Sequence, residues 1–412
     1  MKMLQVNCVY NNGSTGKIVY DIHRGLQAEG IESVVCYGRG QKVSEPNVYK
    51  TSSEIIAKFN ALRSRITGLQ YNGSWIATNK LISIIRKEHP DIVHLHCING
   101  YFVNIYRLFE FLKKNKIRTV LTLHAEFMHT GNCGHAYDCE KWMTGCGQCT
   151  QLWNATKSYY IDRTHAAWVR MQKAFEGFDA LEIVSVSQWL QYRAMQSPIM
   201  KGHRFSVIWN GIDTKETFHP CDFQYLKEKH GLKDEKILLH VTANFSLRED
   251  DKKGGRYIVK LAERLSNENI KFVVVGGRDL TIPLPENIIN VGCINNQKEL
   301  AAYYSMADIT VLTSERETFS MVCAESLSCG TPVVGFKAGA PEQISLPEYS
   351  EFVEYGDMDT LVEALNRWMG MKCNCQQDIV RKSEALYSRE KMCEKYRNLY
   401  ANIAYGLDEL CV

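Results

Sequence analysis

The chain has 412 residues, enough for about two large domains. Its 45% hydrophobic and 23% charged residues are typical of a globular protein and exclude a largely disordered chain. The net charge of +3 hides an asymmetry, because residues 1–209 contain 25 Lys and Arg against 15 Asp and Glu (+10), whereas residues 210–412 contain 24 against 31 (−7). Such a difference indicates different partners for the two halves.

Short runs of β-branched and other apolar residues alternate with helix-length amphipathic segments along the chain. The predicted strands are Met3–Val9, Ser33–Tyr37, Ile92–His96, Arg118–Leu123, Leu181–Ser185, Phe205–Ile208, Ile237–Val241, Lys271–Val275, Ile289–Val291, Ile309–Leu312 and Pro332–Gly335. The predicted helices include Gly16–Glu29, Tyr101–Asn115, Lys252–Ser266, Gln297–Met306 and Thr318–Ser328. This alternation predicts an α/β protein with two Rossmann-like, doubly wound parallel-sheet lobes, 1–209 and 210–412. Ligands would bind in the cleft between the lobes, outside the carboxyl ends of the strands.

The first residues of the sequence do not predict an export signal. Its first apolar run is too short for a signal peptide, since Asn11, Asn12 and Gly13 interrupt it. The sequence contains no run of about 18 apolar residues, so no transmembrane helix is expected. The 15 cysteines are odd in number and mostly scattered, unlike those of a secreted disulfide scaffold. We therefore expect a cytoplasmic protein, with peripheral binding to the inner face of the cytoplasmic membrane left open.

Two features of the first half point to the cleft. Asn11–Gly16 follows the first predicted strand, and its Gly13 could approach a ligand closely. This turn matches neither G-x-G-x-x-G nor a Walker A loop, which disfavours a nicotinamide enzyme and a P-loop phosphotransferase. His94, His96 and His124 lie at the ends of predicted strands, and therefore at the cleft face. Each could be a packed structural histidine, but three together indicate a functional site.

The segment Ile55–Gln70 mixes cations with apolar residues at helical spacing. The cations are Lys58, Arg63 and Arg65, and the apolar residues include Ile55, Ile56, Phe59, Leu62, Ile66 and Leu69. Such a helix can lie on an anionic membrane surface, although a helix packed on the core with a solvated charged face fits the pattern equally well. No nucleic-acid-binding motif or aromatic stacking platform accompanies the basic first half, so nucleic acid is not an expected partner.

A cysteine cluster occupies an insert at 129–150. Its members, which fall within 17 residues, are Cys133, Cys139, Cys146 and Cys149. A C-x2-C pair with two further thiols predicts a structural, tetrahedral zinc site. Such a site would not be catalytic, because four thiolates leave no open position. An iron–sulfur centre fits less well, a disulfide pair conflicts with a reducing compartment, and four free thiols are the alternative.

The second half contains two candidate anion sites. Arg248 and Lys253 flank an acidic triplet and precede two glycines, a combination that suits a diphosphate. Glu317 precedes the predicted helix Thr318–Ser328, whose first N–H groups would attract an anion, and Glu325 could reach a ribose diol. A solvated charged turn and a helix-capping carboxylate are the corresponding alternatives.

Together these motifs resemble those of a GT-B-fold retaining glycosyltransferase of family 4, of the bacterial exopolysaccharide and colanic-acid type. The matching stretches are Val186–Trp189, Asn210–Asp213, Arg248 with Lys253 and Gly254, Ala307–Glu317, the E-x7-E spacing from Glu317 to Glu325, and Ser326–Val334. His94-Leu95-His96, Thr122-Leu123-His124 and the Cys-rich insert add to the likeness, which covers nearly the whole chain.

The resemblance implies a role for each site residue. Arg248 and Lys253 would hold the donor diphosphate, and no catalytic metal would be needed because these cations take its place. The other implied contacts are Glu317 and His124 with the transferred sugar, Glu325 with the ribose, the Phe319 and Ser320 amides with the distal phosphate, Gly13 with the donor phosphates, and the Cys293 or Ile294 backbone with the base.

The implied activity is retaining transfer of a hexose from a nucleotide-diphosphate sugar to a lipid-linked glycan in bacterial exopolysaccharide or lipopolysaccharide synthesis. The basic lobe 1–209 would receive the acceptor at the membrane surface. The lobe 210–412 would bind the donor, with its last helix crossing back to the first lobe. A nucleotide-sugar hydrolase or epimerase and a non-catalytic nucleotide-sugar-binding subunit are the alternatives. Two positions depart from the family pattern: Ala125 stands where many relatives have Asp, and Thr318 where many have Gly.

Overall fold

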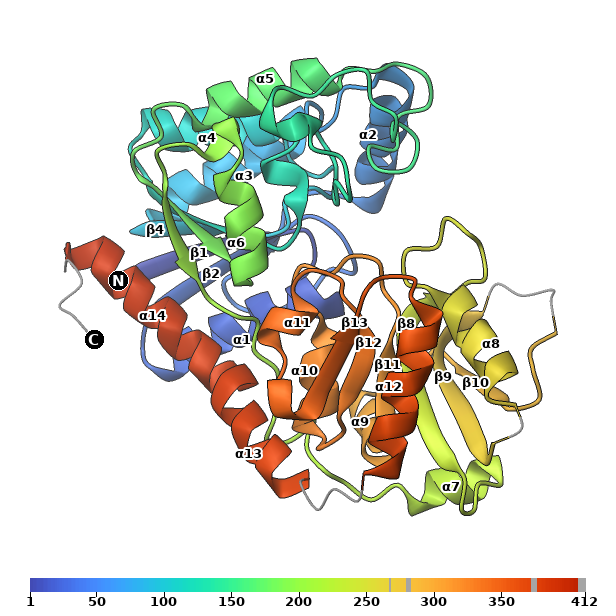
Figure 1. Ribbon diagram of the computed structural model, residues 1–412. Coiled ribbons are helices and arrows are strands. Elements are labelled where there is room, and N and C mark those ends of the chain that lie inside the picture. The colour runs from blue at the N-terminus through green and yellow to red at the C-terminus, as the bar shows by residue number, and fades with distance from the viewer. Residues whose placement is uncertain (267, 279–282, 372–375, 407–412) are drawn as a thin grey trace. The chain divides into compact units, whose positions relative to one another are not determined.

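The computed structural model describes residues 1–266, 268–278, 283–371 and 376–406. They form two compact units: unit 1 comprises residues 1–209 and the described residues from 392 on, and unit 2 comprises the described residues of 210–391. Each unit is a parallel sheet covered by helices (Figure 1). Within the described ranges, no helix has both the length and the apolar character needed to cross a membrane.

Unit 1 is built on a seven-stranded sheet with the order β3-β2-β1-β4-β5-β6-β7. Its strands are β1 (Lys2–Asn7), β2 (Glu32–Tyr37), β3 (Val48–Lys50), β4 (Ile92–Leu95), β5 (Arg118–Leu123), β6 (Leu181–Ser185) and β7 (Arg204–Val207). Its helices are α1 (Gly13–Ala28), α2 (Glu54–Thr67), α3 (Trp75–Glu88), α4 (Ile105–Lys114), α5 (Thr164–Phe175), α6 (Gln188–Met195) and most of α14 (Arg389–Tyr405). All strand pairs are parallel, so the carboxyl ends of β1, β4 and β5 share one edge.

The last helix belongs to the core of unit 1. Tyr396 and Tyr400 of α14 pack with Ile18 and Ile22 of α1 against the sheet. The two helices approach closely at Gly25, where a Cβ atom would lie 3.1 Å from the sulfur of Cys393. Residues from the end of the chain therefore line the same core as the first strand.

Unit 2 is built on a six-stranded parallel sheet with the order β10-β9-β8-β11-β12-β13. Its strands are β8 (Lys236–Phe245), β9 (Ile270–Arg278), β10 (Ile288–Gly292), β11 (Ile309–Leu312), β12 (Val333–Phe336) and β13 (Ser350–Val353). Its helices are α7 (Gln224–His230), α8 (Gly255–Arg264), α9 (Gln297–Met306), α10 (Met321–Ser328), α11 (Pro341–Ile344), α12 (Met358–Gly370) and α13 (Gln376–Tyr387). Ile258 and Leu261 of α8 and Leu361 and Leu365 of α12 pack on the same face of this sheet.

The predicted α/β class with parallel sheets is confirmed. Some helix starts were wrong: α1 begins at Gly13 rather than Gly16, and α8 begins at Gly255 rather than Lys252. Gly254 has a φ of +75°, which lies in the left-handed region and is incompatible with a helix interior. The short strands β3 and β13 were not predicted.

Candidate functional site

Lys253 and Glu317 are in contact, although they lie in separate loops after β8 and β11. The Nζ atom of Lys253 lies 2.6 Å from Oε1 of Glu317. The two strands are neighbours in the sheet, and parallel neighbours bring the loops at their carboxyl ends together. The same loops are joined by the Glu315 amide, which donates to the Lys252 carbonyl at 2.9 Å, and by the Lys252–Glu315 ion pair at 2.8 Å. The structure thus brings two predicted site residues together.

A close backbone approach fixes the position of Lys253. Thr313, the residue after β11, donates its hydroxyl to the carbonyl oxygens of Lys253 and Gly254 at 3.0 and 3.1 Å. A Cβ atom on Gly254 would lie 2.2 Å from the Thr313 carbonyl oxygen. Because the φ of Gly254 is also positive, only glycine fits this position without strain.

Helix α10 begins at Met321, which corrects the predicted start at Thr318. Ser320 has a φ of +80°, and its Oγ accepts a hydrogen bond from the Cys323 amide at 3.3 Å. The serine side chain therefore caps the helix and stops it from extending backwards. Phe319 and Ser320 lie just ahead of a helix N-terminus, whose partial positive charge favours anions such as phosphate.

Glu317 precedes α10 and is anchored by the loop after β12. Its amide donates to the Ala338 carbonyl at 2.9 Å, and its carbonyl accepts from the Ala340 amide at 3.2 Å. The side chain is 17% exposed and points to Lys253. The loop after β12 thus holds the Glu317 backbone, and the loop after β8 holds its carboxylate.

Arg248 makes a different ion pair. Its Nε and Nη2 atoms bind the two carboxylate oxygens of Asp250 at 2.8 and 3.0 Å, and its side chain is 73% exposed. Guanidinium makes the same two-point contact with phosphate. Exposed ion pairs contribute about 1 kcal/mol or less, so a diphosphate could replace Asp250 at small cost.

Glu325 is held by Tyr304, which is not among the predicted site residues. Tyr304 of α9 donates its hydroxyl to Oε2 of Glu325 at 2.9 Å. Burial, with the nearby Glu325 carboxylate, raises the pKa of the Tyr304 phenol well above its ordinary value, so the hydroxyl remains a donor. No motif marks Tyr304, because the contact joins two separate helices.

Cys293 and Ile294 follow β10 directly, at the carboxyl edge of the unit 2 sheet. The Cys293 side chain is exposed, and its sulfur lies 3.9 Å from the Ala243 carbonyl oxygen in β8. A Cβ atom on Gly277 of β9 would lie 3.0 Å from the same sulfur. The two predicted base-binding residues therefore lie at the same sheet edge as Lys253.

In unit 1, His94, His96 and His124 form a hydrogen-bonded group at the ends of β4 and β5. Nδ1 and Nε2 of His94 lie 2.6 Å from the Tyr400 hydroxyl and 2.7 Å from the Thr122 hydroxyl. Nδ1 of His96 lies 3.2 Å from Nε2 of His124. Burial lowers the pKa of His94 and His96 well below the ordinary value and lowers the pKa of His124 to about 4. All three rings are therefore neutral near pH 7.

The hydrogen-bond network assigns the tautomers of two of these rings. Nε2 of Gln5 donates to the Val19 carbonyl at 3.4 Å, which leaves Oε1 of Gln5 facing Nε2 of His96 at 3.2 Å. Nε2 of His96 must then carry the proton, and Nδ1 accepts from Nε2–H of His124. The neutral His124 ring consequently keeps an unprotonated Nδ1.

Gly13 is the first residue of α1 and is exposed. Its φ is +61°, and no atom lies within 4 Å of a Cβ atom built there. Its backbone is therefore open at a helix N-terminus, as a phosphate contact would require.

Glu126, two residues after His124, is fully buried. Its carboxylate accepts from Nε of Arg193 at 2.6 Å and from the Ala136 amide at 2.7 Å. Burial acts to raise the pKa of Glu126, but interactions with His129, Arg193 and Ala136 outweigh it and lower the pKa to about 2. The carboxylate therefore anchors the Cys-rich insert to α6.

Burial raises the pKa of the Cys133 thiol, and the nearby Cys149, Cys146 and Cys139 thiols add to this effect. Cys133 packs against Ala136 and Trp142, and the Cys149 amide donates to the Asp162 carboxylate at 2.6 Å. These contacts set the backbone of the insert. Among the residues that the structure describes, which include all of 129–150, no three His, Cys, Asp or Glu side chains are grouped to hold a metal ion. The structure thus gives no support to the predicted zinc site, whose members, Cys133, Cys139, Cys146 and Cys149, are free thiols.

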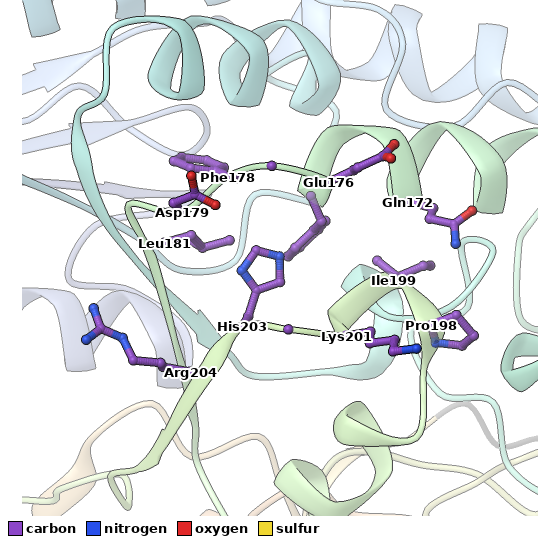
Figure 2. A pocket seen from close by; sticks show the side chains of 13 residues that line it. Gln172, Glu176, Phe178, Asp179, Leu181, Pro198, Ile199, Lys201, His203 and Arg204 are labelled. Atoms are coloured by element: carbon purple, nitrogen blue, oxygen red, sulfur yellow. The ribbon is translucent and has the colours of Figure 1, made fainter.

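A cavity of about 610 Å³ lies elsewhere in unit 1 (Figure 2). Leu181 and Arg204, which line it, begin β6 and β7, so the cavity is at the amino edge of the sheet, opposite His124. The His203 ring packs on Phe175 with centroids 5.6 Å apart, and burial lowers the pKa of His203. None of the predicted site residues that the structure describes lines this cavity.

Comparisons with known proteins cover almost the whole chain. Residues 15–216 match the family model described as Glycosyltransferase Family 4, and residues 222–396 match Glycosyl transferases group 1. The putative colanic acid biosynthesis glycosyl transferase WcaC of Escherichia coli K12 is 25% identical, over 98% of this chain and 100% of its own length.

Solved structures share the fold. Sucrose-phosphate synthase of Thermosynechococcus elongatus superposes with a TM-score of 0.68 at 15% identity, covering 98% of this chain and 100% of that one. HepE of Anabaena, solved in complex with UDP-glucose, gives a TM-score of 0.65 at 12% identity, with the same coverage. The predicted GT-B fold is confirmed.

Proposed function

Because the chain belongs to the GT-B glycosyltransferases of family 4, we propose that it transfers a hexose from a nucleotide-diphosphate sugar to a lipid-linked glycan. We place the reaction in the synthesis of a bacterial surface polysaccharide, on the inner face of the cytoplasmic membrane. The description of the Escherichia coli relative supports this setting, and the UDP-glucose complex of HepE supports the donor class.

The observation that carries the proposal is the contact between Lys253 and Glu317. It joins a cation and a carboxylate at the carboxyl edge of a parallel sheet, next to the N-terminus of α10. Lys253 would balance the charge of the leaving diphosphate, and Glu317 would accept hydrogen bonds from hydroxyls of the sugar next to it. Positive groups aimed at developing charge are a main source of catalysis in such a site.

The other site residues take the roles that the resemblance implies. Arg248 would release Asp250 and bind the diphosphate together with Lys253. Glu325, positioned by Tyr304, would bind the ribose. The remaining assignments are the Phe319 and Ser320 amides to the distal phosphate, the Cys293 or Ile294 backbone to the base, Gly13 to the donor phosphates and His124 to the transferred sugar.

We propose retention of the anomeric configuration without an enzyme nucleophile. The bond between the anomeric carbon and the diphosphate oxygen breaks, and the acceptor oxygen bonds to the same face of the sugar. The acceptor proton passes to an oxygen of the leaving phosphate. Arg248 and Lys253 would supply the charge stabilisation that a metal provides in other transferases.

A transfer assay tests the proposal. The chain would be incubated with radiolabelled uridine, guanosine and thymidine diphosphate hexoses and a bacterial membrane extract, with Lys253→Ala as the matched control. Label in the lipid-extractable fraction, lost in the variant, is the expected result. Release of free sugar or an isomer would instead support the hydrolase or epimerase alternative, and donor binding without turnover would support a non-catalytic subunit.

A further inference from the structure

Helix α2 exposes its large apolar side chains. Ile55, Phe59, Leu62 and Ile66 recur at intervals of four, three and four residues, so they share one face, which we call the α2 stripe. They are 81%, 66%, 50% and 50% exposed. A surface helix of a globular protein normally turns such a stripe toward the core.

The face of α2 that packs on unit 1 is small and polar. Its buried residues are Ala57, Asn60 and Ser64. Asn60 donates to the Ser74 hydroxyl at 2.8 Å, and the Ser64 hydroxyl donates to the Leu69 carbonyl at 3.0 Å. The alternative in which the apolar face packs on the core is therefore wrong, and the helix is held without help from the α2 stripe.

Aromatic side chains flank the C-terminal end of α2. The Tyr159 amide donates to the Arg65 carbonyl at 2.7 Å, so the segment 153–161 lies against the helix. Trp153 stacks on Tyr159 with ring centroids 5.0 Å apart, and Trp153 and Tyr160 are 60% and 87% exposed. Trp and Tyr are the side chains enriched at membrane–water interfaces.

Exposed cations occur on the same helix and in the adjoining segment 153–161. The exposed ones are Lys58, Arg63, Arg65 and Lys157. Glu54, the acidic residue of α2, binds Arg39 at 2.8 Å, and Asp162 accepts from the backbone amide of Thr164 at 2.9 Å. The surface thus combines an apolar stripe with excess positive charge, which complements an anionic bilayer.

We propose that the α2 stripe, with Trp153 and Tyr160, docks unit 1 on an anionic lipid bilayer. The apolar side chains enter the headgroup region, and the cations contact lipid phosphates. The inference rests on the membrane setting of the proposed function and deepens it, because it names the surface that docks. Docking itself needs neither donor nor acceptor, so it can be tested apart from sugar transfer.

Co-sedimentation of the full chain with vesicles tests the proposal. The vesicles would be pure phosphatidylcholine, or phosphatidylcholine with about one quarter phosphatidylglycerol. Binding is expected to the anionic vesicles and to weaken with salt. Phe59→Ser with Leu62→Ser should weaken it about tenfold or more, because two inserted apolar side chains are lost. Tyr192→Ser with Met195→Ser, which removes exposed apolar groups from α6, should leave it unchanged.

Several results would overturn the proposal. One is wild-type protein that stays in solution with anionic vesicles, and another is a stripe variant that binds like wild type. A third is a wild-type dimer that the stripe variant abolishes, which would assign the α2 stripe to a second copy of the chain. Thermal melts would verify that the variants fold. If the protein transfers sugar to a soluble acceptor but does not bind vesicles, the docking proposal is refuted. The proposed transfer reaction is not affected by that result.

Discussion

The Nζ atom of Lys253 lies 2.6 Å from Oε1 of Glu317, across two loops that are 64 residues apart in the chain. Each side chain holds the other in one orientation. A diphosphate at the proposed site would replace Glu317 as the partner of Lys253, and the Glu317 carboxylate would then accept from a sugar hydroxyl. The ion pair therefore keeps both groups oriented. Replacing it by contacts with the donor should cost little free energy, because Lys253 is half-exposed.

Replacing Lys253 by Ala should lower turnover about 10²-fold or more, because a charge-stabilising group at the leaving diphosphate is lost. Arg248→Ala should have a similar effect. Initial rates with saturating donor would measure both. Lys236→Ala is the matched control, since Lys236 is half-exposed, is paired with Asp308 and lies at the opposite, amino end of β8. A loss in the control as large as that in Lys253→Ala would contradict a specific role for Lys253.

The pH dependence of stability should report the lowered pKa of His124. Burial lowers the pKa of His124 to about 4, whereas the unfolded chain titrates at its ordinary value of 6.5. Below pH 6.5 the His124 ring becomes protonated in the unfolded state, but in the folded state it stays neutral until about pH 4. The free energy of unfolding therefore falls as the pH falls through this window. Between pH 7 and pH 5, His124 should lower the free energy of unfolding by about 2 kcal/mol.

Urea unfolding at the two pH values, in wild type and His124→Asn, would measure this effect. The difference between pH 7 and pH 5 should shrink by about 2 kcal/mol in the variant. His94 and His96 are buried in both proteins, and burial is the largest cause of their lowered pKa, so their contribution should change less than that of His124. Equal pH dependence in the two proteins would show that His124 is not held neutral by burial.

Tyr400→Phe should destabilise unit 1 by about 1–3 kcal/mol, because Nδ1 of His94 is buried and loses its partner. Tyr405→Phe in the same helix is the control, since the Tyr405 side chain is 67% exposed. Urea unfolding of both variants would settle the comparison. If the two substitutions have equal effects, the Tyr400 hydroxyl does not support the histidine group.

The strand positions could be predicted from the sequence where burial on both faces produces β-branched runs. Arg118–Leu123 and Ile309–Leu312 appear with the predicted bounds as β5 and β11. The strands β3 and β13 were missed because they lie at the sheet edges, where short strands carry polar residues and leave little pattern.

The site could be predicted in part. The motifs singled out Lys253 and Glu317 as candidate site residues, but the predicted helix Lys252–Ser266 included Lys253, and only the structure shows that the two side chains touch. The start of α10 depends on the conformation of Ser320, and the orientation of α2 depends on which face of an amphipathic pattern is buried. Periodicity alone cannot decide the latter, because Asn60 and Ser64 pack by hydrogen bonds rather than by apolar contact.

A nucleotide-sugar donor should protect Cys293 from alkylation. Its thiol is exposed beside the proposed base site, so iodoacetamide should label it readily, and an excess of a donor that supports transfer should slow labelling several-fold. Mass spectrometry of the modified peptides would give the rates. Cys139, in the insert, provides the internal control and should react equally with and without donor. Undiminished labelling of Cys293 would remove it from the base site.

Gly254→Ala should abolish most activity by displacing Lys253. The added Cβ would lie 2.2 Å from the Thr313 carbonyl oxygen, so one of the two loops that position Lys253 and Glu317 must move.

Gly231→Ala separates this clash from backbone strain. Gly231 has a φ of +66°, close to the +75° of Gly254, but no atom lies within 4 Å of its added Cβ. Both variants should lose about 1–2 kcal/mol of stability from the left-handed conformation. Only Gly254→Ala should also lose turnover, because a shift of about 1 Å in a charge-stabilising group can cost about 10²-fold in rate. If Gly231→Ala loses as much turnover as Gly254→Ala, global destabilisation rather than the position of Lys253 explains the effect.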